Sequence, residues 1–237
     1  MTEAPRALPP PLTCDVLQRR LDLPVKPDAV QLEGVRFRLE PLDPTRHRKA
    51  LFELTCGRPM RVGDMKCEAY DPDEWVWRYL SEGPFADEFE LEGFLGRLVD
   101  APDRLALCVV HKPTEHPVGV ATFMSNVPSC LRIELGNIWY GPVAQGSGAN
   151  LEATLLMLEH AFALGYHRVE WKCNSLNERS RRAALRMGFT FEGIQEQHMI
   201  IKDRNRDTAW FRMLEREWPE IGPRLRSMRD RQFGLSG

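Results

Sequence analysis

Residues 131–191 read LRIELGNIWYGPVAQGSGANLEATLLMLEHAFALGYHRVEWKCNSLNERSRRAALRMGFTF. The alternation of apolar residues at the start of this stretch predicts a strand that ends at Gly141-Pro142. A glycine-rich turn follows, then a helix from about Gly148 to Leu164, a second strand and a short helix. Free backbone N–H groups at a helix start converge on an anion, and the helix dipole favours negative charge there. The stretch therefore predicts a binding site for a nucleotide-like cofactor that carries phosphate.

Two common phosphate-binding patterns do not fit the loop. Walker-type loops place Gly-Lys-Ser/Thr at the helix entrance, and dinucleotide folds place G-x-G-x-x-G after the strand. The residues here are Gln145-Gly146-Ser147-Gly148-Ala149-Asn150. The cofactor therefore belongs to neither of those two classes.

The loop resembles the acetyl-coenzyme A loop of the GNAT superfamily of N-acetyltransferases, whose pattern is Gln/Arg-x-x-Gly-x-Gly/Ala. Gln145 and Gly148 match this pattern, and Asn150 stands where the family prefers Gly or Ala. Downstream, Asn177-x-x-Ser180 and the Arg-Met-Gly-Phe run at 186–189 resemble the N-x-x-S…K-L-G-F signature of the ribosomal-protein N-terminal acetyltransferase (Rim-type) branch. The two matches follow in the family's order.

The resemblance covers residues 33–215 and implies a mixed α/β (α+β) GNAT fold. Such a fold has a mostly antiparallel sheet of six or seven strands with helices on both faces. The implied activity is transfer of an acetyl group from acetyl-CoA to a primary amine, on a protein N-terminus or an amino-acid-like small molecule. Homodimers are common among these enzymes. A non-catalytic acyl-CoA sensor and an acyltransferase for longer chains are the alternatives.

Length and composition favour one domain with extensions. The chain has 237 residues, of which 43% are hydrophobic, enough for a sizeable core. We expect a Pro-rich N-terminal extension over 1–32, the acetyltransferase domain over 33–215, and a C-terminal helix and tail over 216–237.

The charge and cysteine content exclude several classes of partner. The formal net charge of −2 indicates neither a nucleic-acid nor a membrane-surface partner. The six cysteines form no C-x-x-C pair, and no apolar run reaches the ~18 residues of a membrane span. We therefore expect a reduced, cytoplasmic protein without a metal site.

The rest of the chain predicts further elements from its periodicity and turn signals. We expect a helical stretch at Cys14–Leu21, a first strand at Val35–Leu42 with Val35, Phe37 and Leu39 on one face, and helices at His47–Leu54, from Asp71 onward, and at Phe85–Val99. Strands follow at Leu105–His111, Val118–Ser125, Phe189–Gly193, Gln197–Lys202 and Thr208–Leu214, and a terminal helix at Glu215–Met228.

The predicted cofactor site consists of the loop and three further residues. In the loop, Gly146 and Gly148 let the backbone approach phosphate, although glycines also simply shape tight turns. The resemblance adds Asn177 as a coenzyme A ligand. The whole predicted set is Trp139, Tyr140, Gln145, Gly146, Ser147, Gly148, Ala149, Asn150 and Asn177.

Two residues are the catalytic candidates. Alternation places Glu134 on the strand face opposite Ile133 and Leu135. The resemblance implies that this strand splays from the next one to admit the pantetheine arm, where a carboxylate could draw the amine proton through water; Arg132 is its expected ion-pair partner. The alternative is a solvated strand glutamate. The resemblance gives Ser180 the role of protonating the departing thiolate, and the alternative is a helix serine bonded to its own backbone.

Aromatic residues are the candidates for acceptor contacts. In the family, the segment after the first strand lies over the acceptor side, which makes Tyr70, Trp75 and Tyr79 candidates, with Trp171 as a pocket wall. Ordinary core packing is the alternative for each. Cys173 is expected to be a buried core residue, because no base adjoins it and a thiol without one is a poor nucleophile. Direct attack of the amine in a ternary complex follows.

The last predicted helix carries a capping signal and a basic stripe. Ser175-x-x-Glu178 predicts a capping box that starts the helix near Leu176. Arg179, Arg182 and Arg186 form a stripe that we interpret as a solvated face, from which one arginine could reach a coenzyme phosphate.

Overall fold

The computed structural model describes residues 8–235. In its N-terminal half the elements are α1 (Cys14–Asp22), β1 (Leu32–Glu33), β2 (Phe37–Pro41), α2 (Pro44–Thr55), β3 (Met60–Val62), β4 (Met65–Cys67), the π-helical turn η1 (Asp73–Trp77), α3 (Glu88–Asp100), β5 (Leu105–His111) and β6 (His116–Val127). The later elements are β7 (Arg132–Tyr140), α4 (Ala149–Ala163), β8 (Arg168–Asn174), α5 (Glu178–Met187), β9 (Thr190–Ile201), β10 (Arg204–Leu214) and α6 (Trp218–Phe233).

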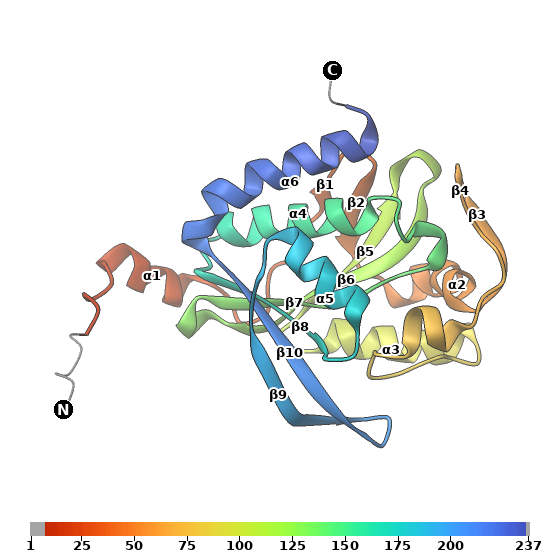
Figure 1. The fold of residues 1–237 in the computed structure, drawn as a ribbon, viewed down its shortest axis with the longest axis horizontal. Helices are drawn as coiled ribbons and strands as arrows, with labels where there is room; N and C mark the ends of the chain where they lie inside the picture. Colours follow the sequence, from red (N-terminus) through yellow and green to blue (C-terminus); the bar gives the residue numbers. More distant parts are fainter. Residues whose placement is uncertain (1–7, 236–237) are drawn as a thin grey trace.

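One eight-stranded sheet with the order β1-β2-β5-β6-β7-β8-β10-β9 forms the centre of the fold (Figure 1). Every neighbouring pair is antiparallel except β7 and β8, which are joined through α4 and run parallel. A parallel pair needs such a crossover connection, and a helix commonly supplies it. The predicted mixed, mostly antiparallel sheet is confirmed.

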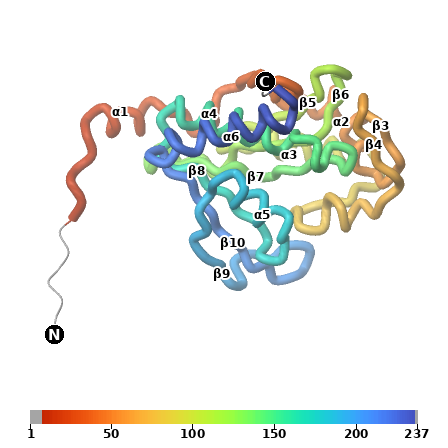
Figure 2. Tube along the Cα trace, turned by 45° about the horizontal axis from the view of Figure 1, so that its top comes forward, coloured from red at the N-terminus to blue at the C-terminus, as the bar shows by residue number. Residues whose placement is uncertain are grey.

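Helices cover both faces of the sheet, as expected. α4 and α6 lie side by side over one face, and α2 and α3 cover the other (Figures 1 and 2). The predicted stripe of α4 is confirmed, because Leu151, Leu155, Leu158 and Phe162 are all buried. α6 packs along α4 through the rings of Trp218 and Phe162, 5.2 Å apart.

The two parallel strands separate part-way along their length. Their pairing runs from Arg132↔Arg168 to Leu135↔Trp171 and no further, while β7 continues to Tyr140. Beyond the last pair, β7 carries a bulge against β6, at which Asn137 has φ 45°. A bulge bends its strand and strengthens the local twist. The separation therefore opens the sheet between two adjacent strands.

A buried carboxylate ties α4 to the start of β2. Glu152, in the first turn of α4, accepts hydrogen bonds from the backbone N–H groups of Val35 (2.6 Å), Arg36 (2.9 Å) and Phe37 (2.8 Å). A Cβ at Gly34 would lie 2.5 Å from the Glu152 carboxyl carbon, so only glycine fits there. This interaction fixes the helix that begins at the predicted cofactor loop.

Several details differ from the sequence-based expectations. The sheet has eight strands rather than six or seven, partly because the two-residue β1 pairs with β2. One continuous strand, β9, replaces the two predicted at 189–193 and 197–202. Val35 lies outside the first strand and is 43% exposed, because the chain there turns to donate to Glu152. The β3–β4 hairpin was not predicted.

The predicted N-terminal helix is confirmed as α1, which projects from the body of the molecule (Figure 2). None of its residues is buried, and Leu17 and Leu21 are exposed. Residues 1–7 of the predicted extension and 236–237 of the predicted tail lie outside the described residues. The division of the chain after residues 32 and 215 stays a prediction.

We expect Glu152→Ala to lower the free energy of unfolding by about 3 kcal/mol or more, because three buried N–H groups lose their acceptor at about 1–3 kcal/mol each. Glu159→Ala is the matched control on the same helix, since Glu159 pairs with Arg226 at a partly exposed site and should cost less than about 1 kcal/mol. Urea unfolding measures both. Equal losses would refute the role of Glu152.

Candidate active site

Two neighbouring cavities open where β7 and β8 separate. The loop cavity, of about 450 Å³, is lined by the turn before α4, by η1, by α5 and by the end of α6. The strand cavity, of about 270 Å³, is lined by β7, β8, β9 and β10 and by the segment after η1. Both cavities are lined by Tyr79, Ile138, Trp171, Asn177 and Ser180. The two spaces therefore meet at these five side chains.

The loop cavity contains free backbone donors at the start of α4. Within residues 8–235, the N–H groups of Gly146, Gly148, Asn150 and Leu151 donate to no oxygen, and all four residues line the cavity. Such donors, together with the helix dipole, form an anion site. The predicted loop thus has the geometry to hold a phosphate group.

Two other loop residues shape the turn instead. The Ser147 hydroxyl donates to the Ala144 carbonyl at 2.7 Å and accepts from the Ala149 N–H at 3.3 Å. Ser147 and Ala149 are not among the lining residues. Their side chains therefore support the cradle from behind.

The two glycines serve different needs. Both have positive φ, 78° at Gly146 and 95° at Gly148, which favours glycine. A Cβ on Gly148 would lie 2.6 Å from the Phe233 ring on α6, whereas none would be crowded at Gly146. The packing of α6 is thus a second reason for glycine at this position, and the expectation that the Gly148 backbone approaches phosphate stays a prediction.

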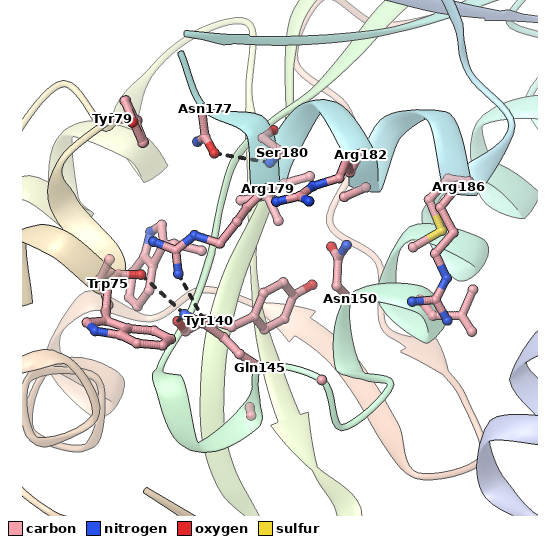
Figure 3. Close-up of a pocket in the computed structure, with 18 of the residues that line it drawn as sticks. Trp75, Tyr79, Tyr140, Gln145, Asn150, Asn177, Arg179, Ser180, Arg182 and Arg186 are labelled. Carbon is pink, nitrogen blue, oxygen red and sulfur yellow. Dashed lines mark hydrogen bonds between the residues drawn. The ribbon is translucent and has the colours of Figure 1, made fainter. Parts of the chain in front are cut away.

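Gln145 connects the loop to the opposite wall (Figure 3). Its amide donates to the carbonyls of Trp75 and Tyr140, both at 3.2 Å, and accepts from Arg179 at 3.4 Å. The Arg179 guanidinium also donates to the Glu74 carbonyl and lies 5.1 Å from the centre of the Trp75 ring. Gln145 therefore joins η1, the loop and α5 across the mouth of the cavity.

The basic stripe of α5 faces the loop cavity. Arg179, Arg182 and Arg186 all line it, with Arg182 and Arg186 beside Asn150 in Figure 3. The solvated face that the sequence predicts for this stripe is therefore also one wall of the cavity. Sequence spacing places the arginines on one side of the helix but does not reveal that this side meets the anion cradle.

Two buried polar groups of β7 lack partners in the described part of the chain. They are the Trp139 indole N–H and the Tyr140 hydroxyl, and both residues line the loop cavity. The Tyr140 hydroxyl points toward Asn150 (Figure 3), and burial raises its pKa. Buried donors without a protein partner are rare, and a bound ligand or an ordered water can satisfy them.

Asn177 and Ser180 meet at the junction of the cavities. The Asn177 side chain accepts from the Ser180 N–H at 3.0 Å and caps α5, so the predicted Ser175 capping box is wrong. Ser180 Oγ accepts from the Trp171 indole N–H at 3.0 Å. The serine thus has a side-chain partner instead of bonding only to its own backbone. Burial raises the pKa of the nearby Cys173 thiol, and a hydrogen bond with Ser180 opposes this.

Glu134 lies in the strand cavity, but its partner differs from the predicted one. The Glu134 carboxylate is buried and lies 2.7 Å from Lys172 Nζ, whereas Arg132 pairs with Glu170 at 2.8 Å. The expected Arg132–Glu134 pair is therefore wrong. The parallel register opposes Glu134 to Glu170 and so brings Lys172, two residues further along the same face, next to Glu134.

Three of the four predicted acceptor residues reach the cavities. Tyr79 and Trp171 line both, and Trp75 lines the loop cavity alone. Tyr70 lines neither, because its hydroxyl donates to the Leu54 carbonyl at 2.8 Å, and burial raises its pKa to about 12. Tyr70 is therefore a structural residue, contrary to the prediction.

The model of the acetyltransferase (GNAT) domain matches residues 36–190. The chain belongs to the GNAT acetyltransferase family. Its activity is therefore acetyl-CoA-dependent transfer of an acetyl group to an amine.

No curated protein matches its sequence. None of the helices in the described part of the chain is long and apolar enough to span a bilayer.

Two solved structures are similar in both sequence and fold. A GCN5-related N-acetyltransferase from Brucella melitensis shares 36% identity at a TM-score of 0.76, covering 86% of this chain and 87% of the other. A probable acetyltransferase of the GNAT family from Chromobacterium violaceum shares 34% identity at a TM-score of 0.76, and the match covers 92% of this chain and 100% of the other.

A more distant structure shares the fold alone. It is the Salmonella typhimurium acetyltransferase that modifies the N-terminal serine of ribosomal protein L7/L12, with 18% identity and a TM-score of 0.62, covering 81% of this chain and 98% of that one. Rim-type enzymes are thus among the structural neighbours of this chain.

The loop cavity fits acetyl-CoA. Four free N–H groups at the start of α4 suit its pyrophosphate, and Arg182 and Arg186 supply positive charge beside them. The unpartnered groups of Trp139 and Tyr140 lie along the same path toward the junction. The donors match a ligand that is anionic at one end and polar along its arm.

We expect Tyr140→Phe to raise the Kd for acetyl-CoA about threefold to tenfold, the worth of one hydrogen bond, while the free protein keeps its stability. Tyr70→Phe should do the opposite, losing about 1 kcal/mol of stability without changing the Kd, because its hydroxyl bonds within the protein. Calorimetric titration and urea unfolding measure the pair. An unchanged Kd in Tyr140→Phe would remove that hydroxyl from the cofactor site.

Proposed function

We propose that the chain acetylates a primary amine by direct attack in a ternary complex, with acetyl-CoA in the loop cavity and the amine in the strand cavity. The observation that carries the proposal is the junction of the two cavities at Tyr79, Ile138, Trp171, Asn177 and Ser180. Donor and acceptor that enter from opposite sides meet there. Holding two reactants in line contributes effective molarities on the order of 10⁵ M or more.

The chemistry needs two proton transfers and no strong base. Acetyl-CoA supplies the activated acetyl group as a thioester. The neutral amine nitrogen forms the new bond to the acetyl carbon, the bond from that carbon to sulfur breaks, the nitrogen gives up one proton, and the departing thiolate gains one. Reference pKa values of about 7.7–8.0 for an α-amine and about 8.5 for a thiol make both steps mild near pH 7.

Glu134 and Ser180 are suited to the two proton transfers. Glu134 is the carboxylate that lines the strand cavity, so we assign it the amine proton, taken through water. Ser180 lines both cavities, so we assign its hydroxyl to the departing sulfur. Lys172 holds the Glu134 carboxylate in place.

Direct attack is favoured over a covalent acyl-enzyme. Cys173 is the nearest thiol to the junction, and burial raises its pKa, which leaves it in the less nucleophilic neutral form. Its neighbour Ser180 has Trp171 as a hydrogen-bond donor, not a base. Neither side chain has the activated environment of a nucleophile.

Calorimetric titration with acetyl-CoA, followed by thiol release with amino acids, aminoacyl compounds and short peptides, tests the proposal. Binding with turnover is the expected result. Binding without turnover on any amine would favour the acyl-CoA sensor, and tighter binding of longer acyl-CoA would favour the longer-chain alternative.

We expect Glu134→Gln to lower kcat about 10²-fold, the scale of one general base, with little change in the Kd for acetyl-CoA. Glu134 does not line the loop cavity, which is why cofactor affinity should persist. Rates between pH 6 and 9 measured beside wild type check the role. Wild-type turnover over that range would exclude Glu134 as the base.

We expect Ser180→Ala to slow transfer about 10²-fold. The variant should also lose about 1–3 kcal/mol of stability, because the Trp171 indole N–H loses its acceptor. Ser175→Ala is the matched control, because Ser175 lines neither cavity and should keep wild-type rates. A change below about threefold in Ser180→Ala would make that serine a structural residue.

A further inference from the structure

The strand cavity is lined by more positive than negative side chains. Arg104, Lys172 and Arg206 line it, and Glu134 is the only carboxylate among its lining residues in the described chain. Lys172 and Glu134 form an ion pair at 2.7 Å. Arg104 lies 3.5 Å from Asp103, which is outside the cavity lining, and its buried Nε makes no hydrogen bond within the described residues. Arg206 is the one of these three cations that has no carboxylate within salt-bridge distance in the described chain.

Arg206 has no counter-ion in the part of the chain that the structure describes. No carboxylate lies within salt-bridge distance of its guanidinium, and its Nε is buried without a hydrogen-bond partner. Burial lowers its pKa, opposed by the nearby Cys173 and Glu134. A partly buried cation without a partner is unfavourable, and it repels an ammonium group. An occupant that brings an anion removes both penalties.

The other walls limit the size and character of that occupant. The cavity volume of about 270 Å³ is below the roughly 300–1,000 Å³ of pockets for drug-sized ligands. Met124, Met199 and Ile201 give it apolar lining. At the β9–β10 turn, Lys202 donates to the Trp77 carbonyl at 2.8 Å, which fixes the hairpin against η1 and closes that side. A small molecule with an uncharged side chain fits these walls.

We propose that the acceptor is a small primary amine that carries a carboxylate, an α-amino acid with an uncharged side chain, and that Arg206 binds its carboxylate. The inference rests on the proposed function and narrows its acceptor. The planar guanidinium matches a carboxylate with two parallel hydrogen bonds. A peptide N-terminus has an amide at that position and offers no charge to Arg206.

Matched acceptors test the carboxylate directly. Alanine, valine, leucine and methionine are compared with their amides, and with tripeptide amides that begin with the same residues, in thiol release from acetyl-CoA. We expect kcat/KM for the best amino acid to exceed that for its amide by about 10- to 100-fold, the range for hydrogen bonds to charged groups. Equal or faster turnover of amides or peptide would overturn the inference and leave the acetyltransferase proposal intact.

A neutral variant identifies the residue. Arg206→Met should lower kcat/KM for the best amino acid about 10- to 100-fold, chiefly through KM, while the amide and the Kd for acetyl-CoA stay within about threefold. Arg204→Met is the control on the same strand, since Arg204 is exposed and lines neither cavity. Equal losses on amino acid and amide would overturn the role of Arg206. Acetyl-CoA binding with no turnover of any amine would refute the proposed function as well.

Discussion

The separation of β7 from β8 is the constraint on which the rest of the structure depends. Four pairs hold the two strands together at one end, and a bulge at Asn137 turns β7 away at the other. Antiparallel neighbours keep each strand in the sheet, so the opening is a property of the backbone and not of a mobile segment. The loop with the free N–H groups lies on one side of this opening, and the carboxylate of Glu134 lies on the other.

Contacts of α4 and α6 fix the position of the loop beside this opening. Glu152 joins the first turn of α4 to β2, and the end of α6 packs against Gly148 through Phe233. Gln232 of α6 donates to the Gly146 carbonyl at 3.4 Å and lines the loop cavity. The loop cavity is thus completed by a helix that lies beyond the residues 36–190 of the family match.

Local sequence patterns predicted the fold and the loop at the start of α4, but not the contacts in the strand cavity. Turn chemistry and helix periodicity located the loop and α4, because the anion cradle consists of consecutive residues. The contacts of Glu134 were not predictable in the same way, since they depend on the register of two strands that are far apart in sequence. Arg206 comes from the β9–β10 hairpin, and only the pairing of β10 with β8 brings it near Glu134.

Side-chain direction explains the other differences. Tyr70 belongs to the right segment but donates to Leu54 instead of facing a cavity. Ser175 and Asn177 both suit a helix start, and the backbone geometry that selects Asn177 is set by β8 and β10, where the Ser175 N–H donates to Asp207. Short motifs give the residue types at a site, and packing decides which of them face it.

In the proposed ternary complex, acetyl-CoA and the amine acceptor meet where β7 and β8 separate. A crystal structure of the chain with coenzyme A tests it most directly. We expect the pyrophosphate to contact the free N–H groups of Gly146, Gly148, Asn150 and Leu151, and the thiol sulfur to lie at the junction beside Ser180. A sulfur atom outside the opening between β7 and β8, or a pyrophosphate away from the loop, would contradict it.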